Sequence, residues 1–168
     1  MEQMPNLLNF IEKNGTLLTE TGQNDHTDVR PTIMELVGLQ DGYVHDGRVI
    51  TEVLTSKVLP KSLKSNTALL QQLGQAYKQI NAPFGALGMA SLTVSTVALS
   101  SNTPNDLTYL DAENQIEGWI VQRNSLATQM RTMLDDAEFG GQPINASDAK
   151  ELIKEADSLI AEAQKAAM

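Results

Sequence analysis

Side chains of the kinds that carry catalysis and metal binding gather in one stretch of the sequence, residues 25–54. The stretch contains both histidines of the chain and several aspartates, namely His26, His45, Asp25, Asp28, Asp41 and Asp46. Imidazole and carboxylate groups are ligands for metal ions and are also the commonest general acids and bases. A metal or acid–base site in this chain would therefore have to draw mainly on this stretch.

The spacing of these residues does not match an established ligand pattern. A zinc site needs three or four nitrogen, sulfur or oxygen ligands, and the chain has no cysteine and no HExxH spacing. The loop at 41–47 fails the calcium-loop pattern, because its glycines fall at other offsets and no Glu follows at the twelfth position. We expect no metal and no cofactor, and we assign these residues turn and capping roles. A hard-metal site built from His26 and the aspartates is the alternative.

The same stretch predicts two short helices. Pro31 tolerates the first turn of a helix, and residues 32–37 continue it for one to two turns. The buried side of this helix is expected to carry the apolar residues Ile33, Met34, Leu36 and Val37. Gly38 stands where a left-handed C-terminal cap is wanted. Residues 48–55 resume an apolar-periodic pattern, which predicts the second short helix.

Two arginines stand beside aspartates in this stretch. Arg30 and Arg48 could pair with Asp28 and Asp46, which would hold the two turns against each other. Alternatively, both guanidinium groups could face a phosphate in a larger enzyme, since Arg recognises phosphate bidentately. We favour the ion pairs, because the Asp neighbours are present in the chain.

The order of residues in this stretch resembles a known pattern, T-D-x-R-P-T, then L-x-G-L, then D-G-R followed by an apolar residue. The residues that carry the resemblance are Thr27, Asp28, Arg30, Pro31, Thr32, Leu36, Gly38, Leu39, Asp46, Gly47, Arg48 and Val49. The pattern resembles the last part of the catalytic domain in bacterial phosphoesterases of the alkaline phosphatase superfamily. The resemblance continues into the helical region, so it covers residues 25–168 and leaves the first 24 unmatched.

The resemblance implies a chemistry for which the chain shows no residues. Enzymes of that superfamily use a Thr or Ser nucleophile beside a two-metal site of Asp and His residues, and these motifs precede the matching segment. No phosphate-binding loop, nucleophile elbow or dinucleotide fingerprint is present either. We therefore expect no catalytic residue, and we name His26, Asp28, Arg30, Asp46 and Arg48 as motif residues of interest only.

Composition limits the classes of partner. The net charge is −9 and the sequence pI is about 4.6, which argues against nucleic acid, whose binding needs a basic face, and against an anionic membrane. The absence of cysteine excludes disulfides and thiol catalysis. Residues 1–15 lack a basic region followed by an apolar run, so no secretory signal is visible. The resembled family is often exported, and the compartment stays open.

Helical periodicity dominates from residue 66 onward. Apolar residues at three-to-four spacing predict helices at 66–81, 86–100 and 106–138, and a last helix that starts from the capping run at 145–148. The helix at 86–100 is apolar on nearly every side, so it should be the most buried. Asn105 or Asp106 should cap the long helix that follows. The stripes of the last two helices predict an antiparallel hairpin over 106–167 that buries Trp119.

These patterns together predict a mainly α protein in two parts. Residues 1–60, with a short helical segment before residue 20, form a remnant of the end of a phosphoesterase catalytic domain. Residues 61–168, entered through a connector at 56–65, form a helical extension that ends in the hairpin. The expected function is that of a non-catalytic C-terminal portion of a phosphoesterase, structural or assembling, whose partner is the missing catalytic portion. The alternative is an independent helical interaction module that self-associates through the hairpin. A self-sufficient metal-dependent phosphatase is a third, less favoured interpretation.

Overall fold

The computed structural model describes residues 26–40, 42–54, 61–64 and 66–168, and every regular element in those ranges is helical. The predicted mainly α class is therefore confirmed. The prediction for residues 1–20, and that for most of the connector at 56–65, lies outside the described residues. The exception within the connector is the short helix α3 (Lys61–Lys64).

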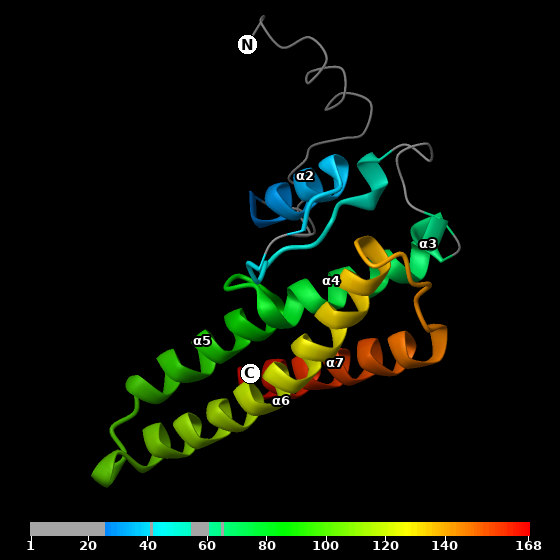
Figure 1. Ribbon diagram of the computed structural model, residues 1–168. Coiled ribbons are helices and arrows are strands. Elements are labelled where there is room, and N and C mark those ends of the chain that lie inside the picture. Colours follow the sequence, from blue (N-terminus) through cyan, green and yellow to red (C-terminus); the bar gives the residue numbers. More distant parts are fainter. Residues whose placement is uncertain (1–25, 41, 55–60, 65) are drawn as a thin grey trace, which may run out of the picture.

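The long helices form a bundle that ends in the predicted antiparallel hairpin. Helix α4 (Thr67–Asn81) is followed by a break and then by α5 (Ala86–Leu99). Helix α6 (Leu107–Glu138) returns past α5 and α4, and α7 (Ala146–Ala166) runs back along all three (Figure 1). The core between these helices consists of Leu, Ile, Val, Met and Ala with Tyr77 and Trp119, as the low aromatic content requires.

Residues 26–54 lie on one side of α4 (Figure 1). They form the short 3₁₀ turn η1 (His26–Asp28), helix α2 (Val29–Val37) and a second 3₁₀ turn η2 (Thr51–Val53). The helix predicted at 48–55 is thus only one 3₁₀ turn. The segment before η2 instead buries the side chains of Val49 and Ile50, and the backbone N–H of Ile50 donates to a side chain of α2.

Two predicted caps are present and a third is not. Gly38 has φ +65° and its N–H donates to the carbonyl of Glu35, which closes α2 as expected. The Asn145 side chain accepts the N–H groups of Ser147 and Asp148 at the start of α7. Before α6, however, Asn105 and Asp106 both have positive φ and neither caps through its side chain. A sharp turn at η3 (Pro104–Asp106), rather than a side-chain cap, begins this helix.

Helix α2 has the orientation opposite to the predicted one. Its buried residues are Pro31, Thr32 and Glu35. Of the four residues predicted to be buried, Ile33, Leu36 and Val37 are about half exposed, and Met34 is partly buried. On its buried side, the Thr32 hydroxyl bonds to Asp28 and Ile50, and the apolar periodicity could not reveal these bonds.

Helix α5 is less buried than predicted. Its inward residues are Leu87, Ala90, Val94 and Ala98, while Leu92, Val97 and Leu99 are 58%, 60% and 68% exposed. When a helix is apolar on every side, its sequence does not show which sides the bundle covers. One side of α5 is exposed to solvent.

Candidate functional site

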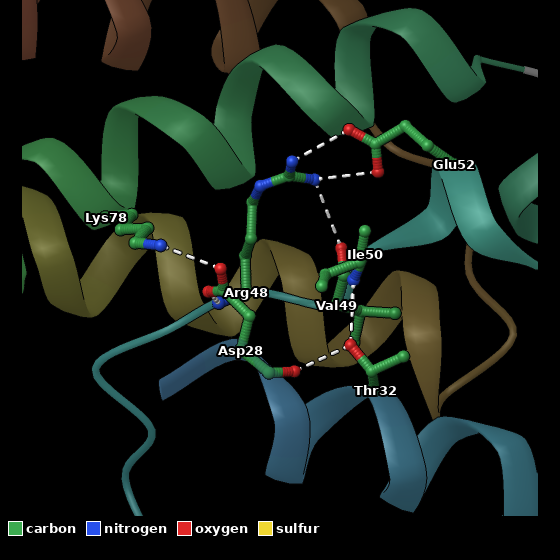
Figure 2. Close-up of polar contacts among 7 residues, drawn as sticks. All are labelled: Asp28, Thr32, Arg48, Val49, Ile50, Glu52 and Lys78. Atoms are coloured by element: carbon green, nitrogen blue, oxygen red, sulfur yellow. Dashed lines mark hydrogen bonds and ion pairs between the residues drawn. The ribbon is translucent and has the colours of Figure 1, made fainter. Parts of the chain in front are cut away.

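The most concentrated polar site in the described chain surrounds Asp28, at the junction between η1 and α2 (Figure 2). Its carboxylate is fully buried. Oδ1 accepts the backbone N–H of Arg48 at 2.8 Å, and Oδ2 accepts Nζ of Lys78 at 2.7 Å. Lys78 comes from α4 and is itself only 2% exposed. A buried carboxylate is tolerated only with such partners. Because Lys78 belongs to α4, Asp28 joins the motif segment, which we define as residues 26–54, to the bundle.

Thr32 makes the second attachment. Its hydroxyl donates to the Asp28 carbonyl at 2.7 Å and accepts the backbone N–H of Ile50 at 2.9 Å. Asp28, just before α2, and Thr32 in its first turn thus accept the backbone N–H groups of Arg48 and Ile50 (Figure 2). These bonds satisfy donors that would otherwise be buried without a partner.

Gly47 is required by the close approach of the two segments. A Cβ at this position would lie 2.4 Å from the Thr27 carbonyl carbon and 2.5 Å from Asp28 Oδ1. No side chain fits there. The Gly of the D-G-R pattern is therefore explained by contact distance rather than by turn conformation.

Arg48 lies along α4 with its guanidinium on η2. Nη2 and Nη1 reach the two carboxylate oxygens of Glu52 at 2.7 and 3.0 Å, and Nη1 also donates to the Val49 carbonyl at 3.3 Å. Gly74 of α4 makes room for the chain of Arg48, because a Cβ there would stand 3.2 Å from its Cδ. Burial alone would raise the pKa of Glu52, but the hydrogen bonds and charge of Arg48 hold it below its usual value. We call Asp28, Thr32, Arg48, Glu52 and Lys78 the Asp28 cluster.

A second group of acids lies close to this cluster. Glu138, at the end of α6, is buried, and burial together with the nearby charge of Glu35 raises its pKa well above the usual range. Burial likewise raises the pKa of Glu35 and of Asp135. A cavity of about 40 Å³ next to Glu138 and Arg48 has room for a water molecule or two. This cavity is far below the several hundred Å³ of a ligand pocket. An open hollow of about 520 Å³ is lined by Arg48 and Glu52 together with residues of α4 and α7.

Tyr77 fixes the loop that precedes Arg48. Its hydroxyl donates to the His45 carbonyl at 2.5 Å, and burial raises its pKa to about 12. Asn81, one turn further along α4, donates to Asp46 at 3.3 Å and accepts from Arg123 of α6 at 3.1 Å. These contacts tie the loop to two helices of the bundle.

The residues of interest named from the sequence lie in different surroundings. Asp28 and Arg48 meet in the Asp28 cluster, and Asp46 binds Asn81 beside it. His26 and Arg30 are exposed, and the Arg30 guanidinium stands 4.5 Å from the centroid of the Tyr43 ring.

The predicted ion pairs need correction. The guanidinium of Arg48 pairs with Glu52 rather than with Asp46, and Asp28 pairs with Lys78. The pairing was assigned by closeness in the chain. Arg48 and Glu52 are four residues apart, and Asp28 and Lys78 are 50 residues apart. The two segments are nevertheless held together as expected, by different bonds.

No group of three or more His, Asp or Glu residues in the described part of the chain is arranged so that it could hold a metal ion. Asp25 and Asp41, which the hard-metal alternative would need, lie outside the described residues. The Asp28 cluster contains cationic side chains as well as carboxylates, and these carboxylates accept hydrogen bonds from Lys78 and Arg48. Its arrangement suits a structural junction rather than a reaction.

Sequence reasoning missed Lys78, Glu52 and Glu138. A signal for Lys78 existed, because it lies one turn from Gly74 on the buried side of α4, between the apolar residues Tyr77 and Ile80. A lysine in that position has to find an anion. Glu138 carried no such signal, since its burial depends on where the motif segment sits.

Comparison with protein-family models, with curated proteins and with solved structures found no match to this chain.

Proposed function

We propose that this chain is the non-catalytic C-terminal portion of a phosphoesterase of the alkaline phosphatase superfamily, and that it braces the catalytic portion. The observation that carries the proposal is the structural use of the motif that bears the resemblance. Asp28, Thr32, Gly47 and Arg48 hold residues 26–54 on the helical bundle. A motif that attaches a segment to a helical bundle fits the boundary between a catalytic domain and a helical extension.

The exposed side of α2 supports a partner on that side. The polar side of the helix is used by the Asp28 cluster, and its apolar side faces outward. The exposed apolar residues of α2 and the loop after it are Val29, Ile33, Leu36, Val37, Leu39, Tyr43 and Val44. An outward apolar face on a firmly attached helix is typical of an interface. In the proposed enzyme, this face packs against the catalytic portion.

The chain's contribution to such an enzyme is positional. The cluster attaches α2 to α4 through buried, charge-assisted hydrogen bonds, which are stronger than neutral ones. These bonds hold α2, and whatever packs on it, at one position on the bundle. In this proposal, the chain itself does not catalyse the reaction.

The first test is enzymatic. The purified chain should not hydrolyse p-nitrophenyl phosphate or bis(p-nitrophenyl) phosphate with added Zn²⁺ or Mn²⁺. Metal-dependent turnover that is lost in His26→Ala would overturn the proposal in favour of a self-sufficient phosphatase.

The second test concerns the partner. The DNA on the 5′ side of the Met1 codon should encode a polypeptide with the nucleophile and metal motifs of the superfamily. That polypeptide, made separately, should bind this chain, and Ile33→Asp should weaken the binding at least tenfold in calorimetry. Val121→Asp on α6 is the matched control, since Val121 is also exposed (65%) but lies elsewhere. Absence of the motifs, or equal effects of both variants, would contradict the proposal.

The alternative function, a helical module that self-associates through the hairpin, meets a specific difficulty. The α7 stripe and the C-terminal part of the α6 stripe are buried in the chain's own core, including Trp119, Met130, Ala156 and Leu159. Leu107, Leu110 and Ile120 of the α6 stripe are 53%, 45% and 43% exposed. A second copy could reach only this exposed part of the hairpin without opening the bundle.

A further inference from the structure

Two buried acids lie near each other where α2 approaches the end of α6. Glu35 comes from the inward side of α2 and is 7% exposed, and Glu138 is the last residue of α6 and is 9% exposed. After burial, the charge of Glu35 is the largest cause that raises the pKa of Glu138. Both carboxyl groups cannot be ionised in this position without a cost in free energy, because like charges repel and burial removes the water that would solvate them.

Neither acid is neutralised by a bond to the described part of the chain. The side chains of Glu35 and Glu138 make no hydrogen bond and no ion pair with the described residues. The buried carboxylate of Asp28, by contrast, accepts a backbone N–H and the ammonium group of Lys78. A buried carboxyl group without such partners is favoured in its neutral form. The two acids are therefore stable in this position when they hold a proton.

The nearest cation that acts on Glu138 is already paired. The charge of Arg48 lowers the pKa of Glu138, but by less than burial, Glu35 and Asp135 raise it. The two terminal nitrogens of the Arg48 guanidinium hold both carboxylate oxygens of Glu52. Arg48 therefore offsets only part of the cost of a charge on Glu138.

The other charged groups around this position do not change this balance. Those that line the cavity beside Glu138 are His45 of the loop, Tyr77 of α4, and Arg131 and Asp135 of α6. Burial raises the pKa of Asp135, and the charges of Arg131 and His45 offset only part of this effect. Helix α3 contributes the Ser62 hydroxyl, which donates to the Ala137 carbonyl at 2.7 Å, while its lysines, Lys61 and Lys64, are exposed.

Water has access to this contact between α2 and α6. The cavity of about 40 Å³ lies between Pro31 of α2, the loop at 43–49 and the last turn of α6, and Glu138 forms part of its wall. A water molecule fits there, and it can carry a proton to and from the carboxyl group. The protonation of Glu138 can therefore follow the pH of the solvent while the bundle stays folded.

We propose that Glu35 and Glu138 form a proton-dependent latch, which holds the motif segment on the bundle while at least one of the two carboxyl groups is protonated. When both are ionised, residues 26–54 leave the bundle. The bundle keeps its own core, whose buried residues lie between Leu63 and Ala163. The latch is a property of this chain alone, so it does not depend on the phosphoesterase origin proposed above.

The direction of the pH effect follows from the two states of the segment. With α2 docked, burial raises the pKa of both Glu138 and Glu35. With the segment released, both acids reach water and return towards the ordinary value of about 4.3. Docking is therefore strongest below this pH and weakens as the pH rises through the raised pKa. The docking equilibrium constant falls by up to about tenfold per pH unit for each proton that is lost.

A buried thiol in the motif segment measures the opening of the latch. The chain has no cysteine and Val49 is 3% exposed, so Val49→Cys in the full chain should react with 4,4′-dithiodipyridine only when the segment is released. Its protection, relative to a cysteine-containing peptide at the same pH, should fall by about tenfold or more between pH 5 and pH 8. Adding Glu138→Gln should reduce this fall to about threefold or less, because the amide has no proton to lose. Adding Glu155→Gln, at an exposed position of α7, should leave the fall unchanged.

Amide hydrogen exchange of the wild type gives the same information without a substitution. After correction for the intrinsic effect of pH, exchange at Ile50, whose N–H is held by Thr32, should accelerate between pH 5 and pH 8. Exchange at Met130 in the core of α6 should not. Ala156→Cys, at a fully buried position of α7, should stay protected from the thiol reagent over the whole range.

Three results would overturn the latch. The first is protection of the Ile50 amide and of the Val49→Cys thiol that does not change with pH. The second is a fall in protection that Glu138→Gln leaves unchanged. The third is an equal fall in Ala156→Cys, since this would mean that the whole bundle unfolds rather than the motif segment alone.

Discussion

Lys78 Nζ lies 2.7 Å from Asp28 Oδ2, and both side chains are almost completely buried. The pair joins α4 to the start of α2 across 50 residues of sequence. Desolvation of two charges is costly, and their attraction offsets the cost only when the remaining hydrogen bonds are also made. Asp28 meets this condition, because its other oxygen accepts the Arg48 N–H.

Removing one member of this pair should destabilise the junction more than removing both. Lys78→Met leaves the Asp28 carboxylate buried without its cation, so we expect a loss of about 3–5 kcal/mol in the free energy of unfolding. Asp28→Asn with Lys78→Met should recover part of the loss. Urea denaturation of the single and double variants gives the coupling energy. Additive losses would mean that the two residues do not interact as the distance implies.

The same pair predicts where the chain opens. The buried core cluster consists of residues between Leu63 and Ala163, so we expect Lys78→Met to release residues 26–54 first. Amide hydrogen exchange at Arg48 and Ile50, whose N–H groups are held by Asp28 and Thr32, should accelerate by at least tenfold. The amide of Met130 in the core of α6 should be affected less. Uniform acceleration at all three positions would indicate global unfolding instead.

Gly47 should be intolerant of any side chain. A Cβ would lie 2.4 Å from the backbone of Thr27, and a backbone atom cannot move aside as a flexible side chain can. We expect Gly47→Ala to cost about 1–3 kcal/mol, as overpacking does. Gly118→Ala in α6 is the control, because no atom lies within 4 Å of the added methyl, and it should stabilise the helix by up to about 1 kcal/mol. Thermal melts of the two variants should therefore move in opposite directions.

The sequence was sufficient to locate the long helices and insufficient to orient the short ones. Periodicity over many residues defines α4, α6 and α7, because their apolar stripes have a single core to cover. In α2, the apolar stripe of Ile33, Leu36 and Val37 was correctly grouped but wrongly pointed inward. The polar residues Asp28, Thr32 and Glu35 are buried instead. Asp28 and Thr32 bond to Lys78 and Ile50, which follow them by 50 and 18 positions.

The candidate site was partly predictable for the same reason. Asp28 and Arg48 stand out in a motif, and the structure brings them together. Their main ionic partners, Lys78 and Glu52, follow from the packing of α4 and from the 3₁₀ turn at η2. Glu52 follows Arg48 by four residues, so the spacing gave a local signal for this pair, whereas the pairing of Asp28 with Lys78 depends on packing that no local spacing encodes.

The cap of α7 gives a direct test of a local feature that was predicted correctly. Asn145 Oδ1 accepts the N–H of Ser147 at 3.0 Å and that of Asp148 at 3.4 Å. Asn145→Ala removes both bonds and should cost about 1 kcal/mol. Asn124→Ala, at an exposed position within α6, should instead stabilise by a few tenths of a kcal/mol through helix propensity. Equal effects in urea denaturation would show that the cap contributes nothing.

Glu138 should make the stability of the fold depend on pH. Burial, and then the charge of Glu35, raise its pKa well above the usual value in the folded state, so the folded protein holds this proton more tightly than the unfolded chain does. A raised pKa of this kind contributes stability that is complete below the unfolded pKa, about 4.3. The contribution is lost as the pH rises from there through the folded pKa, by up to about 1.4 kcal/mol per pH unit.

Glu138→Gln replaces the acid by a neutral side chain of the same shape and should remove this loss. The variant and the wild type should be similarly stable at pH 4, and the variant should become progressively more stable towards pH 8. Guanidinium denaturation at unit steps of pH measures the difference. Glu155→Gln, on the exposed side of α7, controls for the loss of one formal charge. A difference that stays constant from pH 4 to 8, or that grows equally in both variants, would mean that Glu138 is ionised in the folded protein and has found a cation.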